Sequence, residues 1–506
     1  MPKSKKFNYS ANSTKGEIAN FLKKSPHAFD SDDLWCFVTK KGIKMLNLNH
    51  IPADGRLKTL SFSIKSREHF ERILAFGERV DGSSLFPYID TENSDLYIVP
   101  KISSAFVNPF STLPTLNFIC SYFDGSGKEP EISPSYVLKN SITSLKKKTG
   151  LELLAAGEIE YYSIVKKDPY LMYPCAQQKG YHESRPFVKS QDMNEEILYV
   201  LHNIGINAKY GHSEVGFIDT EESTLEQFEI ELDLEPLEEM ADHIVLTKWV
   251  IRNVAAKYSR EVTFAPKLAF GNAGSGMHIH IAAFKNSENV LIDKNEELSD
   301  TAKSIIGGLL KLAPSITAFG NTVPISYMRL VPYHEAPTNI CWGDRNRTAL
   351  IRVPLGWRKI RCFNDEKRKY KKKLVGHATQ TIELRSPDCS AHPHFLLAAI
   401  AVAARHGLLD KNCIKIAKEG YVSTNVFRGD KELRAKLLQL PSSCAESASM
   451  LRAHASFYLE DNVFSKRLIE GVAKQLESFK DTNFVAEIRG DAKKARDFVL
   501  QFMHCG

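Results

Sequence analysis

The chain has 506 residues, of which 43% are hydrophobic and 25% are charged, the composition of an ordinary globular protein large enough for two domains or more. No run approaches the roughly 18 apolar residues of a membrane span. Nine scattered cysteines without a CxxC pair argue against a disulfide framework or a zinc site, and they predict reduced thiols in a cytoplasm. The net charge of +7 is concentrated in residues 357–374, where nine Lys and Arg accompany two acidic residues. Because the remainder is balanced, neither membrane nor nucleic-acid binding is expected.

Residues 1–108 are predicted to form a small α/β domain. They mix strand-like runs, LWCFVT at 34–39 and DLYIVP at 95–100, with polar turns. The proline-bearing stretch NPFSTLPT at 108–115 marks the expected boundary to a second domain, 109–506.

The second domain is predicted to combine strands with helices. Apolar residues recur at three- and four-residue intervals from Met240 to Tyr258, which indicates a helix. From about residue 395 onward the pattern is mostly helical. The segment FLLAAIAVAARHGLL at 395–409 is apolar nearly all round, which predicts a buried helix.

Three strand-like segments of this domain carry polar or charged residues at positions i and i+2, which lie on one face of a strand. They are Glu158-Ile159-Glu160, His278-Ile279-His280 and Glu383-Leu384-Arg385, and the acidic stretches HSEV and QFEIEL lie between them. Each pair alone is typical of a solvent-facing strand. Together they favour a carboxylate-rich metal site, because a bound cation removes the cost of burying such charges.

Oxygen ligands with one imidazole suit Mg²⁺ or Mn²⁺ better than Zn²⁺, and Mg²⁺ held by carboxylates commonly serves phosphoryl transfer. Several arginines fall near the same segments, and guanidinium groups bind phosphate and carboxylate through paired hydrogen bonds. They are Arg329, Arg345, Arg347, Arg352 and Arg385. No Walker loop or dinucleotide fingerprint is present, so a nucleotide must be held differently.

Eight short motifs in order resemble those of the bacterial-type (type I) glutamine synthetase family. They are DGSS, GEIEYY, HSEV, QFEI, FGNAGSGMHIH, NTVPISYMRLVPYHEAP, DRNRTALIRVP and TIELRSPD. The resemblance implies an α+β fold, with an N-terminal β-grasp-like domain followed by a catalytic domain of a curved, mostly antiparallel sheet with outer helices. It also implies ATP-dependent ligation of ammonium to the γ-carboxylate of L-glutamate through γ-glutamyl phosphate.

The resemblance assigns ligands for two divalent metals, Mg²⁺ or Mn²⁺. The first metal would be held by Glu160, Glu214 and Glu229. The second, on the ATP phosphates, would be held by Glu158, His278 and Glu383.

The same resemblance assigns the substrate contacts. The implied ATP-binding residues are His280, Arg347 and Arg352, and the implied glutamate-binding residues are Gly274, Arg329 and Arg385. Glu335 matches an acid on a flap that closes over the intermediate, and Arg347 is also counted as catalytic. The implied ammonium pocket consists of Asp81, Ser84, Tyr181 and Glu214. Asp81 would act as the base from a neighbouring subunit, in hexameric rings that stack into a dodecamer.

The chain departs from the family pattern at several positions. Ala273 stands where the family has an asparagine that helps to hold glutamate. An insertion before Gln227 leaves Glu226 and Glu231 as rivals of Glu229 for the first metal, and Gln-x-Glu spacing favours Glu229. The basic stretch 357–374 lengthens a normally shorter loop.

Two other functions compete with glutamine synthetase. A γ-glutamyl ligase for an amine or polyamine would use the same chemistry, but the small ammonium pocket would have to be opened. A non-catalytic structural relative would be free to lose metal ligands, and all six have candidates here.

Overall fold

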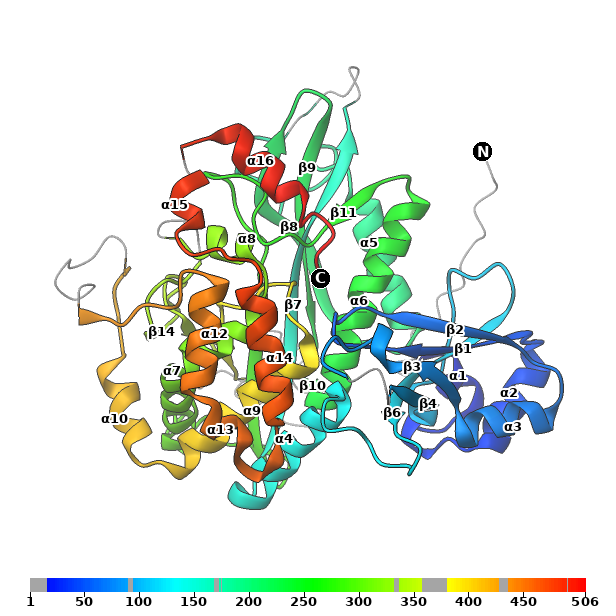
Figure 1. Ribbon diagram of the computed structural model, residues 1–506. Helices are drawn as coiled ribbons and strands as arrows, with labels where there is room; N and C mark the ends of the chain where they lie inside the picture. The colour runs from blue at the N-terminus through cyan, green and yellow to red at the C-terminus, as the bar shows by residue number, and fades with distance from the viewer. Residues whose placement is uncertain are drawn as a thin grey trace, which may run out of the picture.

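The N-terminal part of the chain is a mixed sheet covered by helices (Figure 1). The computed structural model describes residues 16–89, 94–167, 173, 175–331, 336–356, 380–426, 436–488 and 490–506. The strands are β1 (Met45–His50), β2 (Lys58–Ser63), β3 (Glu78–Asp81), β4 (Asp95–Pro100), β5 (Phe106–Val107) and β6 (Thr115–Phe123). Their order is β2-β1-β6-β4-β3, with β5 also paired to β6. The helices are α1 (Gly16–Leu22), α2 (Ser31–Lys41) and α3 (Arg67–Phe76).

One strand expected in this part is a helix. The run LWCFVT at 34–39 lies inside α2, so the strand prediction is wrong there, whereas DLYIVP forms β4. The Asp30 side chain accepts a hydrogen bond from the Asp33 amide, and the Asp33 side chain accepts one from the Asp30 amide. This reciprocal cap stabilises the first turn. Leu34, Phe37 and Val38 then share the buried face at helical spacing.

The N-terminal sheet continues beyond the expected boundary at residue 108. Strand β6 pairs in parallel with β1 and antiparallel with β4 and β5. The stretch 108–115 is therefore the connection between β5 and the start of β6. We place the boundary between the two domains after Phe123.

The second part is a long curved sheet with helices outside it, as the fold prediction stated. Its strand order is β14-β15-β16-β12-β7-β9-β8, and only β14 and β15 run parallel along this path. These strands are β7 (Glu152–Lys166), β8 (Ala208–Asp219), β9 (Ser223–Leu232), β12 (Met277–Lys285), β14 (Trp342–Asp344), β15 (Ile351–Val353) and β16 (Ile382–Leu384). Short strands β10 (Glu235–Pro236) and β11 (Glu261–Thr263) pair with β7, and β13 (Glu288–Asn289) pairs with β12.

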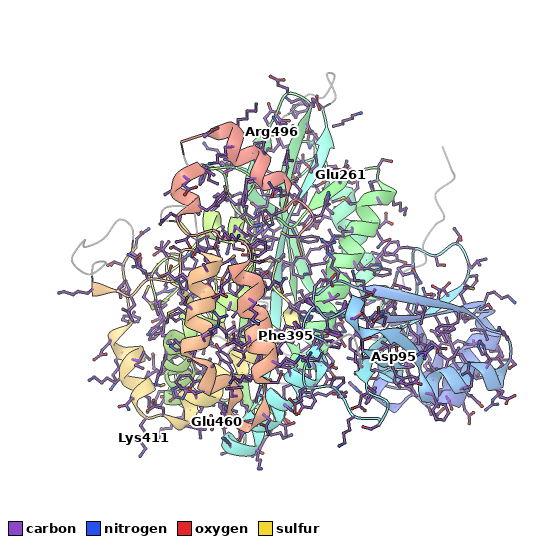
Figure 2. The ribbon with its side chains drawn as sticks, in the orientation of Figure 1. Asp95, Glu261, Phe395, Lys411, Glu460 and Arg496 are labelled. Atoms are coloured by element: carbon purple, nitrogen blue, oxygen red, sulfur yellow. The ribbon has the colours of Figure 1, made fainter. Side chains whose placement is uncertain are left out.

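Helices cover the outer side of this sheet and form a layer beside it (Figure 1). The predicted helix at 240–258 is α6, and the predicted buried helix at 395–409 lies within α9. The helices are α4 (Pro134–Thr149), α5 (Gln191–Asn203), α6 (Leu237–Lys257), α7 (Asp300–Gly320), α8 (Pro324–Arg329), α9 (Pro393–Leu409), α10 (Asn412–Glu419), α12 (Cys444–Ala453), α13 (Ala455–Leu459), α14 (Lys466–Glu477), α15 (Phe484–Ile488) and α16 (Ala492–Leu500). In Figure 2, Phe395 of α9 lies near the centre of the molecule. No helix among the described residues is long and apolar enough to span a bilayer.

The central strand β7 divides its side chains between two faces. A Cβ added at Gly157 would lie 2.9 Å from the Ile244 side chain, so this face packs directly on α6. Ile159 shares that face and is fully buried. The alternate residues Glu158 and Glu160 therefore point to the opposite face of the sheet.

A buried ion pair joins the two domains. Lys101, which follows β4, contacts the Asp242 carboxylate on α6, and His394 of α9 lies 3.1 Å from the same carboxylate. Although burial disfavours its charge, Lys101 and His394 hold the pKa of Asp242 below its usual value. Removing the charge of either Asp242 or Lys101 would leave the other buried without its closest partner, so the ion pair is important to the interface.

Asp242→Asn is expected to lower the free energy of unfolding by about 2–4 kcal/mol, because it leaves Lys101 only the more distant Glu238 carboxylate, 4.0 Å away. Since the pKa of Asp242 is lowered in the fold, the contribution is fully present above about pH 4 and decreases as the pH falls further. Urea denaturation at several pH values measures both effects. The matched control is Glu152→Gln, which removes an exposed pair with Lys146 and should change the stability by no more than about 0.5 kcal/mol. Equal losses in both variants would contradict the prediction.

Candidate functional site

Strand register brings the three i, i+2 segments onto one face of the sheet. Glu158 of β7 lies directly opposite His278 of β12, and Glu160 lies opposite Glu229 of β9. Directly opposed residues of antiparallel strands share a face and have their Cβ atoms about 5 Å apart. On the other side of β12, His280 lies opposite Glu383 of β16.

The residues expected around the second metal converge. Oε2 of Glu158 lies 3.3 Å from Nδ1 of His278, and that nitrogen lies 3.7 Å from Oε1 of Glu383. One potential ligand atom from each of the three lies within 4.8 Å of the others. The three side chains can therefore bind one cation after small adjustments.

The residues expected around the first metal lie next to this group. Ligand atoms of Glu160, Glu229 and His278 also lie within 4.8 Å of one another, as do those of Glu214, Glu229 and His212. Nε2 of His212 lies 3.1 Å from Oε1 of Glu229, and Nδ1 lies 3.9 Å from Oε1 of Glu214. His212 is a site residue that the sequence reasoning missed. Its signal was the same i, i+2 spacing, in His212-Ser213-Glu214.

The two rivals of Glu229 differ in position. Glu226 accepts hydrogen bonds from the backbone amides of Lys189 (2.7 Å) and Ser190 (2.9 Å) at the start of α5. Its position, one residue out of phase with Gln227 and Glu229, puts it on the opposite face of β9. Glu231 shares the site's face, but its carboxylate accepts a 2.7 Å hydrogen bond from Lys209.

The carboxylates perturb one another's protonation. Burial raises the pKa of Glu229 well above its usual value, and the nearby Glu158 and Glu160 raise it further. Burial opposes the charge of Glu158, yet His278 and His280 lower its pKa well below the usual value. For Glu383, burial is outweighed by Arg385 and His280, which lower its pKa to about 2.

The donor set fits hard divalent cations. Four carboxylates and one imidazole line a small cavity, and the Glu383 carboxylate lies beside His278. The mutual repulsion around Glu229 is what a divalent cation would relieve. Oxygen donors with few nitrogens favour Mg²⁺ or Mn²⁺ over Zn²⁺. The cavity is lined by Glu158, Glu160, Glu214, Gln227, Glu229, Ala273, Gly274, His278, Arg329, Arg347 and Arg385.

Four arginines occupy different positions around the carboxylates. The buried Arg329 donates to the backbone carbonyls of Ser386 (2.8 Å) and Arg385 (3.1 Å), which fix its guanidinium at the cavity. Arg385 contacts Glu383 from the same strand segment, and Arg352 lies 2.8 Å from the other oxygen of Glu383. Arg347 is exposed at the cavity mouth.

The loop before β12 approaches the site through its backbone. A Cβ at Gly274 would lie 2.6 Å from the Pro266 carbonyl oxygen and 2.9 Å from Cγ of Arg329, so only glycine fits beside that arginine. The Gly274 carbonyl accepts a 3.0 Å hydrogen bond from Gln227, and the Gly276 amide donates to Glu160 (2.7 Å). Gly276 is a second contact that the sequence reasoning missed.

The ammonium-pocket residues are only partly assembled in one chain. Asp81 is exposed at the end of β3, where hydrogen bonds from Ser84 and Ser83 lower its pKa to about 2. Asp81 and Ser84 do not line the cavity. Tyr181 is 48% exposed, and its ring centroid lies 5.4 Å from that of His212. Glu335 and the stretch 357–374 lie outside the described residues.

Comparison with known proteins gives two adjacent family matches. The glutamine synthetase catalytic domain matches residues 131–478, and the glutamine synthetase β-grasp domain matches residues 42–125. Together they span both parts of the fold.

Whole-chain relatives agree with these matches. A glutamine synthetase of Frankia alni is 30% identical over 471 residues, which cover 87% of this chain and 93% of the relative. A glutamine synthetase of Pyrococcus abyssi is 32% identical, and the match covers 84% of this chain and 89% of that relative. The fold is also that of a cryo-EM structure of Plasmodium falciparum glutamine synthetase, with a TM-score of 0.73, 21% identity and coverage of 92% and 98%. With both domains matched and the carboxylates converging on one face of the sheet, the chain belongs to the glutamine synthetase family.

Proposed function

We propose that the chain is a glutamine synthetase of the bacterial type that joins ammonium to the γ-carboxylate of L-glutamate at the expense of ATP. The observation that carries the proposal is the convergence of all six expected metal ligands on one sheet face, beside Arg329, Arg347 and Arg385. A non-catalytic relative would have no reason to retain the complete set.

Two divalent cations, Mg²⁺ or Mn²⁺, are assigned to the carboxylates. Glu160, Glu214 and Glu229 would hold one, and Glu158, His278 and Glu383 the other. Bound there, the cations supply charge stabilisation for the phosphoryl oxygens.

The chain's own residues then bind and orient the substrates. Arg329 and Arg385 pair with glutamate carboxylates, and Gly274 lets the substrate approach the backbone. His280, Arg347 and Arg352 face the nucleotide phosphates. The γ-carboxylate attacks the ATP γ-phosphate, which releases ADP and leaves γ-glutamyl phosphate. Arg347 stabilises the negative charge, and Glu335, which lies outside the described residues, is assigned as the acid that protects the intermediate from water.

Ammonia then displaces phosphate from the acyl phosphate. Glu214 and Tyr181 form the pocket for ammonium from one chain, and Asp81 and Ser84 of a neighbouring chain complete it. Asp81 accepts the proton that ammonium loses. The exposure of Asp81 and its distance in sequence from every metal ligand support a shared site, and we propose that hexameric rings close it.

The assay that tests the function measures ATP-dependent phosphate release with L-glutamate and Mg²⁺ or Mn²⁺, with ammonium compared against methylamine and putrescine. Ammonium is expected to give the highest kcat/KM, because a pocket bounded by Glu214 and Asp81 suits a small cation. Glu383→Gln is the inactive control. A higher kcat/KM for an amine would instead make the chain a γ-glutamyl amine ligase, and no turnover with any acceptor would make it a non-catalytic relative.

The choice between Glu229 and Glu226 predicts contrasting variants. Glu229→Gln should weaken Mn²⁺ binding on the order of tenfold or more, because it removes a charged ligand. Glu226→Gln should leave Mn²⁺ affinity unchanged but lower stability by about 1–3 kcal/mol, because one acceptor at the start of α5 becomes a donor. Electron paramagnetic resonance titration measures the affinity, and urea denaturation measures the stability. Loss of Mn²⁺ affinity in the Glu226 variant would reverse the assignment.

The shared site predicts complementation between two inactive variants. The Asp81→Ala chain retains a complete metal site. The Glu383→Ala chain retains the Asp81 that completes the ammonium pocket of a neighbouring chain. Mixed oligomers refolded from both should regain part of the wild-type activity, whereas each variant refolded alone stays inactive. Sedimentation velocity verifies that oligomers form, and capture through an affinity tag carried by one variant alone verifies that they contain both. Mixed oligomers without activity would mean that Asp81 does not serve a neighbour.

A further inference from the structure

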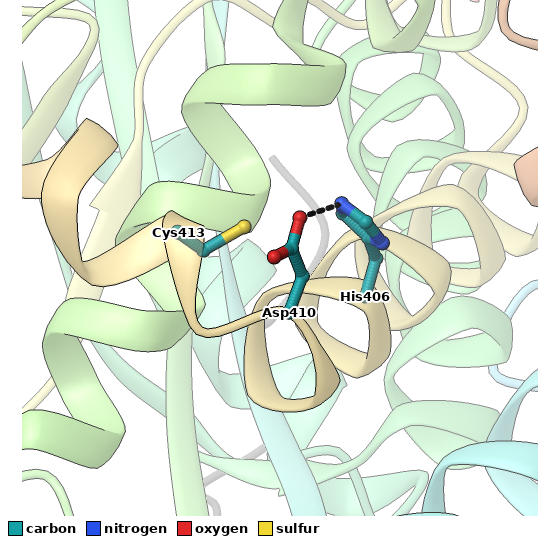
Figure 3. Close-up of side chains that lie close together, drawn as sticks. All are labelled: His406, Asp410 and Cys413. Carbon is teal, nitrogen blue, oxygen red and sulfur yellow. Dashed lines mark ion pairs between the residues drawn. The ribbon is translucent and has the colours of Figure 1, made fainter.

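A second group of metal-ligating side chains lies outside the catalytic sheet, where α9 ends and α10 begins. It consists of His406 in the last turn of α9, Asp410 at the end of that helix and Cys413 in the first turn of α10 (Figure 3). Lys411, in the same connection, marks this region at the lower edge of the molecule in Figure 2. None of the three residues lines the catalytic cavity.

The three ligand atoms have a spacing that fits one small cation. One atom from each side chain lies within 4.8 Å of the other two, and Nε2 of His406 lies 3.5 Å from Oδ2 of Asp410. With metal–ligand bonds of about 2.0–2.1 Å, tetrahedral coordination places a nitrogen and an oxygen ligand about 3.3–3.4 Å apart. The observed 3.5 Å between Nε2 of His406 and Oδ2 of Asp410 is close to this value and is at the limit for a direct hydrogen bond. Nε2 of His406 is a buried atom without a hydrogen-bond partner.

Backbone contacts hold the group in place. The Asp410 amide donates to the His406 carbonyl (2.9 Å), and the Cys413 amide donates to the Asp410 carbonyl (2.9 Å). Oδ1 of Asp410 accepts from the Asn412 amide (3.0 Å), which leaves Oδ2 facing His406. A Cβ at Gly307 of α7 would overlap the Cys413 carbonyl oxygen, so the start of α10 sits directly on α7. The ligands are therefore largely preorganised.

We propose that His406, Asp410 and Cys413 bind Zn²⁺, with water as the fourth ligand. One imidazole, one carboxylate and one thiolate form a borderline-soft set that selects Zn²⁺ over the Mg²⁺ or Mn²⁺ of the catalytic sheet. The forms that coordinate the metal are the neutral imidazole of His406 and the thiolate of Cys413. Cys413 is fully buried; its thiol loses its proton to solvent as the Zn–S bond forms.

Lys311 of α7 opposes metal binding at this site. Its Nζ lies 3.3 Å from Oδ2 of Asp410, on the oxygen that would coordinate the metal. The lysine side chain is 35% exposed, so its ammonium can move into solvent when a cation enters. Zn²⁺ and Lys311 thus compete for one carboxylate oxygen, and removal of the lysine charge should tighten metal binding.

Spectroscopy with Co²⁺, which replaces Zn²⁺ in such sites, separates this site from the catalytic one. The full chain is freed of metal with a chelator, saturated with Mg²⁺ at the oxygen-rich site and titrated with Co²⁺. Coordination by Cys413 produces a near-ultraviolet sulfur-to-cobalt charge-transfer band, which oxygen and nitrogen ligands cannot give. We expect the band to saturate at one equivalent and to disappear on addition of Zn²⁺.

Variants tie the band to the three residues. Cys413→Ser should abolish it, whereas Cys444→Ala, which alters a buried cysteine on α12, should retain it. Asp410→Asn should raise the Co²⁺ concentration needed by at least tenfold and serves if the Cys413 variant does not fold. Lys311→Met should lower that concentration several-fold. Absence of the band in the wild-type chain, its survival in Cys413→Ser, or its persistence with excess Zn²⁺ would overturn the proposal.

Discussion

The burial of several glutamate carboxylates on one face of one sheet is the constraint on which the rest of the structure depends. A buried carboxylate without a partner costs several kcal/mol, and here the neighbours are carboxylates too. The fold offsets part of this cost locally. His278 and His280 stabilise the charge of Glu158, and Arg385 stabilises that of Glu383. Glu229 has only His212 beside it, 3.1 Å away, and its pKa is still raised by burial and by its acidic neighbours, so the region around it gains most from a divalent cation.

The opposite face of the sheet supplies the rigidity that this arrangement requires. Gly157 admits α6 into direct contact with β7, and Ile159 is fully buried beside it. Across the site, backbone carbonyls fix Arg329, and Gly274 leaves room for its side chain. Charged groups held in this way need little rearrangement when substrate charge develops, which is the property that electrostatic catalysis depends on.

The two metal sites that we assign differ in chemistry because they differ in structural setting. The catalytic group lies on paired strands, where alternation and register supply many carboxylates to one face. The second group lies where α9 ends and α10 begins. There His406, Asp410 and Cys413, at positions i, i+4 and i+7, supply three different kinds of ligand. No CxxC pair marks the second site, because its ligands span the boundary between two helices.

The sequence by itself determined which residues carry charge on a shared strand face, since the i, i+2 spacing of Glu158 and Glu160 or of His278 and His280 depends only on the period of a strand. It also determined the family, through ordered motifs. It misassigned residues 34–39, because apolar spacing in a short run is ambiguous and the Asp30–Asp33 cap decided for a helix. Only the tertiary structure separated Glu231 from Glu229, through the contact of Glu231 with Lys209, and added His212, because strand register across β8, β9 and β7 sets which side chains meet. The position of β6 in the N-terminal sheet was likewise settled by pairing between distant segments, which no local pattern encodes.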